Sequence, residues 1–154
     1  MKLSYRLFMR NYPYRKVDWG QGAVLRRPLN ECRLAVVTTA ALHLPSQKAF
    51  DEGIRGGDWS YREIPVGCNL DSLRMAHKSD AFDHTGVESD KNLAMPLDRL
   101  RELVEAGFLG GLTETHYSFM GSITAPGRLI EESAPEVARL LGQQQADAVL
   151  LTPV

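Results

Sequence analysis

The chain has 154 residues, of which 44% are apolar and 24% are charged, with a net charge of −1. This balance is typical of a folded domain with one hydrophobic core, and it excludes a disordered or low-complexity protein. No run approaches the roughly 18 consecutive apolar residues of a membrane-spanning helix, and residues 1–16 lack the apolar stretch of a secretory signal. We therefore expect a cytoplasmic protein with no membrane partner.

The amino-terminal segment differs from the rest of the chain in charge. Residues 1–33 carry eight lysines and arginines against Asp18 and Glu31, so the remaining residues are acidic overall. The same segment contains five aromatic residues: Tyr5, Phe8, Tyr12, Tyr14 and Trp19. Positive charge with aromatic rings is found on nucleic-acid surfaces, and also on arms that pack against an acidic body or a partner subunit. We interpret residues 1–30 as an arm of the second kind, followed by an α/β domain over residues 31–154, and we expect no nucleic acid as a partner.

The first half of the predicted domain contains strands separated by loops. Residues 33–38 form a short apolar run that predicts a buried strand of a parallel sheet. Residues 39–58 show neither a helical nor a strand period, so a loop is expected there. Residues 59–64 alternate as a second strand, whereas residues 73–77 are a weaker candidate because a turn could begin at the same place. Residues 78–91 are polar and acidic, and predict another loop.

Residues 95–107 form the clearest helix of the chain, with a proline in the first turn and a glycine at the end. Its apolar side chains are predicted to share one face: Leu97, Leu100, Leu103 and Val104. Residues 108–112 then predict a strand or a turn, and residues 116–120 predict a strand.

Residues 125–145 again have a helical pattern, which Pro135 either kinks or restarts behind Ser133 in a capping box with Glu136. Residues 147–152 are a second apolar run, as in buried parallel strands. Together the elements predict an α/β fold with a mostly parallel open sheet and flanking helices. Because a parallel strand normally leads into a loop and a helix, the chain is either a small complete protein or a fold truncated after a core strand.

Four histidines stand in or next to predicted loops at the ends of strands: His43, His77, His84 and His116. The loop that holds His77 and His84 also carries four carboxylates: Asp80, Asp83, Glu88 and Asp90. A divalent metal site could be assembled from these groups, but no tight ligand spacing is present, and we expect no metal. The alternatives for each histidine are a hydrogen-bonded loop residue, or a group that positions substrate or moves a proton near neutral pH.

Several common motifs are absent from the sequence. The two cysteines, Cys32 and Cys68, are too few and too far apart for a disulfide framework or a zinc site. The glycine-rich residues 53–57 lack the lysine of a P-loop, and residues 113–121 contain no nucleophile elbow of a serine hydrolase. The residues by themselves therefore predict a cytoplasmic α/β domain with a histidine-bearing cleft.

Six blocks of the sequence carry a resemblance to a known family: LAVVTTAALHLP (34–45), GGDWSYREIP (56–65), LRMAH (73–77), PLDRLREL (96–103), SFMG (118–121) and DAVLLTPV (147–154). In this order they resemble the selenoprotein B family, which contains the selenocysteine-bearing subunits of glycine, sarcosine, betaine and D-proline reductases. The resemblance runs from about residue 31 to the last residue.

The resemblance implies that selenocysteine or cysteine directly follows the strand of the last block, and that two residues and a cysteine come next. An in-frame UGA codon is read as a stop where the decoding machinery is lacking. We therefore expect the chain to be the amino-terminal portion of a longer reductase subunit that ends just before this motif. The alternative is a non-catalytic α/β binding or interaction domain on the same scaffold.

The activity implied by the resemblance is that of an oxidoreductase, which cleaves a C–N bond of an amino acid or betaine-like substrate with electrons from a dithiol. Other reductase subunits are the implied partners, in an oligomer. We expect no cofactor in this chain itself: the selenocysteine is expected just after Val154, and a pyruvoyl group is a possibility on a partner subunit.

The expected site residues stand where predicted loops leave the strands next to the implied motif. We assign Thr38 and Thr39 to substrate binding. We assign His43, His77 and His116 to catalysis, where they position the substrate carboxylate or move a proton. Because the carboxyl ends of parallel strands meet at one edge of a sheet, we expect the three histidines to share one rim that faces the end of the last strand.

Overall fold

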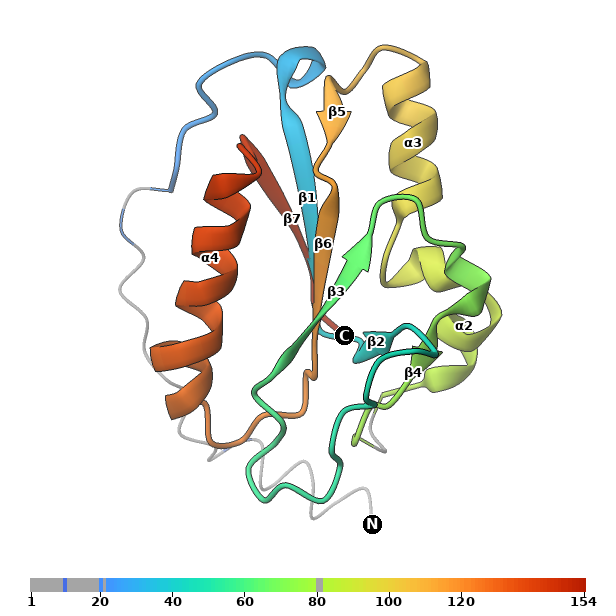
Figure 1. Cartoon of the computed structure of the whole chain (residues 1–154), viewed down its shortest axis with the longest axis vertical. Helices are drawn as coiled ribbons and strands as arrows, with labels where there is room; N and C mark the ends of the chain where they lie inside the picture. The colour runs from blue at the N-terminus through green and yellow to red at the C-terminus, as the bar shows by residue number, and fades with distance from the viewer. Residues whose placement is uncertain (1–9, 11–19, 21, 80–81) are drawn as a thin grey trace.

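The computed structural model describes residues 10, 20, 22–79 and 82–154, and shows a sheet with helices on both sides (Figure 1). The strands are β1 (Arg33–Thr38), β2 (Leu42–His43), β3 (Tyr61–Pro65), β4 (Arg74–Met75), β5 (Gly111–Leu112), β6 (Thr115–Phe119) and β7 (Ala148–Thr152). The helices are α2 (His84–Ser89), α3 (Leu97–Glu105) and α4 (Ala134–Gln143), and the short turns are η1 (Leu29–Glu31), η2 (Leu70–Ser72), η3 (Lys91–Leu93) and the π-helical η4 (Leu129–Ser133). Most of the predicted arm, residues 1–30, lies outside the described residues.

Strand β1 is the centre of the main sheet. Along its whole length it pairs in parallel with β7, from Leu34 opposite Ala148 to Thr38 opposite Thr152. On its other edge it pairs in parallel with β5 near its start and with β6 near its end. Strand β3 continues the sheet antiparallel to β6. The prediction of a mostly parallel open sheet is therefore confirmed.

The helices that connect the parallel strands lie on opposite faces of this sheet (Figure 1). The chain passes from β1 to β6 through α3, and Leu100 of this helix joins Val36 in one apolar core. It then passes from β6 to β7 through α4, where Leu141 joins Ala35 in a second core. Side chains of a strand alternate between its faces, so neighbouring residues of β1 reach both cores.

The order of these strands has a consequence for ligand binding. The next parallel strands along the chain, β5 and β6, lie on one side of β1, and the last, β7, lies on the other side. The direction of strand addition therefore reverses at β1. In open α/β sheets, ligands bind at such a switch point, outside the carboxyl ends of the two strands that flank it. Here those are the carboxyl ends of β1 and β7.

Three local predictions were wrong. The expected loop over residues 39–58 contains β2, which is too short to give a period in the sequence. The expected loop over residues 78–91 contains α2, whose first turn is capped by the Asp83 carboxylate through the Thr85 N–H. Ser133 does not form the expected capping box, because its hydroxyl donates to the Trp59 carbonyl oxygen at 2.6 Å and the helix continues from η4 into α4.

Strand β7 is parallel as predicted, but its side chains are not buried. Val149 is 40% exposed and Leu151 is 67% exposed. Within the described residues, β7 pairs with β1 alone, so its outer edge and part of its surface lack a covering element. In the same part of the chain, no helix has the length and apolar character needed to cross a membrane.

Candidate functional site

Hydrogen bonds join the carboxyl ends of β1 and β7 at the switch point. The Thr39 N–H donates to the Thr152 carbonyl oxygen at 3.2 Å. The Thr39 hydroxyl accepts the N–H of Val154 at 2.9 Å and lies 3.4 Å from the Val154 carbonyl oxygen. Thr38 is fully buried, and its hydroxyl donates to the Thr152 carbonyl oxygen while accepting the Ala40 N–H, both at 3.2 Å. Thr39 therefore fixes the end of β7, whereas Thr38 is enclosed by backbone groups.

His77 is brought to the same place by the segment that follows β4. Its side chain is buried, with 6% exposed, and its Nδ1 atom accepts the Ser79 N–H at 3.2 Å. The ring packs edge-on against Phe82 and His84, with centroid distances of 5.0 and 5.8 Å. The other ring nitrogen, Nε2, is buried and has no hydrogen-bond partner among the described residues.

Gly121, just beyond β6, allows these groups to meet. A Cβ atom on this residue would lie 2.9 Å from the Val154 carbonyl oxygen, and 3.0 Å from both His77 Nε2 and the Thr39 carbonyl oxygen. Any side chain would therefore collide with backbone atoms of both strand ends. Because Gly121 has no side chain, His77 Nε2 and the carbonyl oxygen of Val154 can both approach this point.

A cavity of about 360 Å³ opens beside this point. It is lined by His77, Ser79, Phe82, Asp83, Gly121, Ser122 and Val154. Burial lowers the pKa of His77 below its usual value, and the nearby His84 lowers it further, while Glu52 acts in the opposite direction. The imidazole in the cavity wall is therefore neutral at neutral pH.

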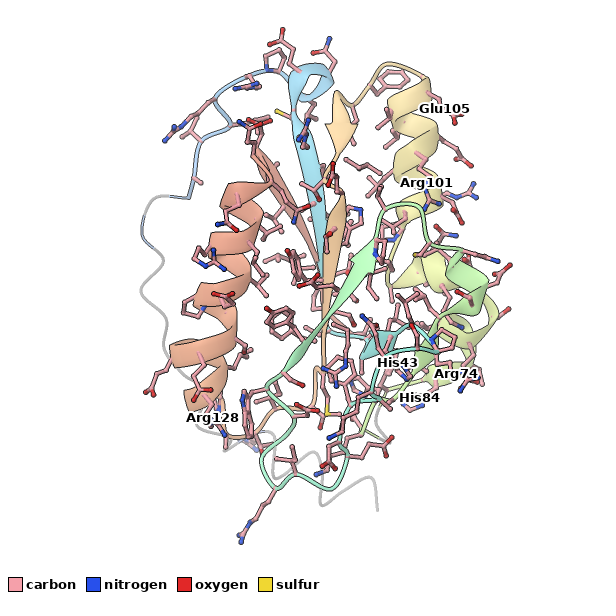
Figure 2. All side chains as sticks on the ribbon, in the orientation of Figure 1. His43, Arg74, His84, Arg101, Glu105 and Arg128 are labelled. Atoms are coloured by element: carbon pink, nitrogen blue, oxygen red, sulfur yellow. The ribbon has the colours of Figure 1, made fainter. Side chains whose placement is uncertain are left out.

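His43 is also buried, but it lies in β2 and not at the cavity beside Val154. It is the second residue of β2, stands opposite Arg74 of β4, and its Nδ1 atom bonds to the Leu44 carbonyl oxygen at 2.9 Å. It does not line the cavity beside Val154. Figure 2 shows His43 and His84 on the side of the sheet away from α4.

His116 lies inside the sheet, so the prediction that it shares a rim with His77 was wrong. It is the second residue of β6 and is fully buried, and its Nδ1 atom accepts the Val36 N–H at 3.1 Å. Burial, and then the charge of Arg101, lower its pKa to about 4. The physical reason is direction: β6 runs parallel to β1, so a residue at its start lies away from the carboxyl rim.

The sequence analysis did not assign Gly121 or Phe82 as residues of this site. Gly121 ends the SFMG block, and a glycine directly after a strand is a signal for a close approach of two backbones. Phe82 lies in the segment expected to be a loop, where no pattern marked it.

The described residues hold no group of three or more His, Cys, Asp or Glu side chains arranged for a metal ion. Asp80, one of the carboxylates considered as a ligand, lies outside the described residues. Cys32 and Cys68 are free thiols, and burial raises the pKa of both. Both are therefore poor nucleophiles at neutral pH.

The fold and the cavity define an α/β domain with a neutral histidine at the switch point of a parallel sheet. The chain belongs to the glycine/sarcosine/betaine reductase selenoprotein B family, which matches residues 1–154. The resemblance found in the six sequence blocks is thereby confirmed.

Three relatives illustrate the family. The D-proline reductase subunit gamma of Acetoanaerobium sticklandii is 33% identical over 126 residues, which cover 82% of this chain and 50% of the relative. The betaine reductase complex component B subunit beta of Peptoclostridium acidaminophilum is 26% identical over 98% of this chain and 34% of its own length. The glycine reductase complex component B subunit gamma of Symbiobacterium thermophilum is also 26% identical, over 98% of this chain and 35% of its own length. The chain thus spans a third to a half of the length of these relatives, and no solved structure matches it.

Proposed function

We propose that the chain forms part of a subunit of a cytoplasmic reductase complex, which cleaves a C–N bond of an amino acid or betaine-like substrate with electrons from a dithiol. The observation that supports this most directly is the cavity at the ends of β1 and β7, where a buried ring nitrogen faces Val154. The relatives are subunits of reductases for D-proline, betaine and glycine, which supports other reductase subunits as partners.

The nucleophile of the proposed reaction is a selenocysteine or cysteine held at the carboxyl end of β7, as the family resemblance implies. The residues around this point suit such a group. Thr39 fixes the backbone of Val154 by hydrogen bonds, and a cavity with both polar and apolar lining lies directly beside it. A selenol is largely ionised at neutral pH, so it would supply an anion able to attack the carbon next to the carboxylate, with the amine leaving as the neutral free amine. A thiol would then take the selenium from this carbon, which gains a proton, and the dithiol would reduce the resulting selenium–sulfur bond.

In this proposal the residues of the chain itself bind the substrate and hold the end of β7 in place. Thr39 holds the strand end by a hydrogen bond to the Val154 N–H, and His77 contributes to the cavity wall its Nε2 atom, which has no hydrogen-bond partner among the described residues. A carbonyl group that binds the substrate amine, such as pyruvoyl, would come from a partner subunit.

The first experiment is to read the nucleotide sequence beyond codon 154. A TGA codon followed by an open frame that encodes two residues and a cysteine supports the proposal. A TAA or TAG codon supports the alternative of a non-catalytic binding domain.

The second experiment measures activity. The full-length subunit is purified with its partner subunits, and loss of glycine, sarcosine, betaine and D-proline is followed with and without dithiothreitol. Dithiol-dependent loss of one of them is expected. No turnover of any of the four, in a complex that contains all subunits, contradicts the proposed function.

A further inference from the structure

His77 carries a hydrogen-bond donor whose position is set by the backbone. The Ser79 N–H can only donate, so Nδ1 of the ring must accept this bond and cannot carry a proton. A neutral imidazole has one ring proton, which is then on Nε2. The same nitrogen is buried and has no hydrogen-bond partner among the described residues. A buried donor of this kind is costly unless a ligand satisfies it.

The surroundings hold this donor between the ring's neighbours and Gly121, at the wall of the cavity. Phe82 and His84 pack edge-on against the ring, and Nε2 and the Val154 carbonyl oxygen both lie about 3 Å from the place where a side chain of Gly121 would begin. Among the described residues, the charged or titratable groups around the ring are His84, Glu52 and the cavity residue Asp83. Burial and His84 together hold the pKa of His77 below its usual value, which keeps the ring neutral at neutral pH.

We propose that His77 is a substrate-binding residue that donates its Nε2 proton, as a hydrogen bond, to the carboxylate of the ligand in this cavity. This inference rests on the proposed function and makes it more specific. A ring with its only proton on Nε2 cannot accept a proton at that atom, and a neutral ring is a very weak acid. It therefore binds an acceptor and does not transfer protons, and an N–H group repels the ammonium end of an amino acid.

Glycine, D-proline and betaine, which the names of the relatives contain, differ in their nitrogen groups but share one carboxylate. A donor that recognises this shared group gives the subunit a common way to orient all of them. The carbon next to the carboxylate would then face the end of β7.

The test compares two variants of the full-length subunit in its complex. In His77→Phe a ring remains to pack against Phe82 and His84, but the donor is lost. In His77→Gln an amide N–H can reach nearly the same place as Nε2. We expect KM for the best substrate to rise about 10- to 100-fold in His77→Phe, as for a lost hydrogen bond to a charged group, and most of this rise to be absent in His77→Gln. KM of the wild type is expected to stay constant from pH 6.5 to 8.

A separate readout does not depend on turnover. Nitrogen-15 NMR of the histidine-labelled subunit is expected to show His77 as the neutral Nε2–H tautomer, with a resonance that shifts when acetate or betaine is added. Choline, which has the same trimethylammonium group without a carboxylate, is expected to leave it unchanged.

The outcomes separate the two proposals. If no substrate is turned over but acetate shifts the Nε2 resonance, the proposed function fails and the carboxylate site stands. If the complex is active but His77→Phe has the wild-type KM, the inference about His77 is wrong. A KM that rises with pH through about 6.5 would show binding by a charged imidazolium, and would also overturn it.

Discussion

At the scale of single residues, Thr39 joins the ends of the two central strands through one hydroxyl group. The Val154 N–H donates to this hydroxyl at 2.9 Å, and a Thr39→Val substitution removes the acceptor with little change in shape. Because a typical hydrogen bond contributes about 1 kcal/mol, we expect the Val154 amide to exchange with solvent about fivefold faster in the valine variant. Hydrogen exchange followed by NMR measures this, with Thr39→Ser as the control that keeps the hydroxyl. Equal exchange rates in both variants would contradict the assigned contact.

His116 is predicted to make the protein sensitive to acid without taking part in the site. Its pKa is lowered to about 4 in the folded protein, mainly by burial, and is near 6.5 when the chain is unfolded. The unfolded chain therefore binds more protons between these values, and stability falls as the pH decreases from about 6.5 to about 4. Complete protonation would cost about 3 kcal/mol, of which about 2 kcal/mol is lost between pH 7 and pH 4.5, where urea unfolding measures it.

The control for this prediction is His116→Asn, whose side-chain oxygen can accept the Val36 N–H in place of Nδ1 but does not titrate. Other groups also titrate in this range, so the comparison is the difference between wild type and variant. An equal loss of stability on acidification in both would show that His116 does not contribute.

The residues of the site were only partly predictable from the sequence. His77 was placed correctly near the end of the last strand, although the strand before it, β4, pairs with β2 in a separate two-stranded sheet and not with the main sheet. His116 looked equivalent in the sequence, since both stand where a loop meets a strand. What separates them is strand direction and register, and these are set by pairing with β1, which a local pattern does not contain.

At the scale of secondary-structure elements, the apolar side chains of α3 differ in burial, although the sequence pattern places them on one face. The sequence places Leu100 and Leu103 on one face, yet Leu100 is 7% exposed and Leu103 is 43% exposed. We expect Leu100→Ala to lower the free energy of unfolding by about 2–5 kcal/mol, because it leaves a cavity in the core. Leu103→Ala is the matched control on the same helix, with an expected loss below about 1 kcal/mol. Urea unfolding of both variants at pH 7 checks this, and similar losses would mean that α3 packs differently.

Elements with enough length were predicted well, and short ones were not. Strand β1 and helix α3 were both expected within two residues of their observed ends, because each has several residues of regular apolar spacing. Strand β2 has two residues and no period, and α2 gave no apolar stripe. The sequence offered one other indication of α2, namely Asp83 as a helix cap, but an aspartate at this place is equally typical of a polar loop.

At the scale of the whole molecule, the site is assembled from segments that are distant in sequence. Thr39, His77, Gly121 and Val154 belong to four of the six blocks that carry the family resemblance, and the fold brings them to one point. Their proximity follows from β6 and β7 lying on opposite sides of β1. The sequence predicted a parallel sheet, but several strand orders are compatible with its pattern, so the meeting point could not be derived from spacing alone.

A second feature at this scale is an apolar groove between α4 and β7, with a volume of about 500 Å³. We call it the α4–β7 groove; it is lined by Val37, Thr39, Phe119, Met120, Gly121, Ile123, Pro126, Leu129, Ala134, Val137, Ala138, Leu141, Val149 and Leu151. Contiguous exposed apolar surface favours association with other chains, and so does a strand edge such as that of β7, which no other described strand pairs. We therefore expect a protein of residues 1–154 to bind a hydrophobic dye such as ANS and to self-associate in solution.

The last prediction assigns this behaviour to the groove. Leu151 lines it and is 67% exposed, so Leu151→Lys places a charge in the groove at little cost to the core. We expect the substitution to reduce both ANS fluorescence and the apparent mass in sedimentation, because the charge must remain hydrated and opposes burial against a second apolar surface. Leu103→Lys on α3 adds the same charge at an exposed leucine outside the groove, and is expected to leave both quantities near their wild-type values. A wild-type chain that is monomeric and does not bind ANS, or equal effects of the two lysines, would show that the α4–β7 groove does not drive association.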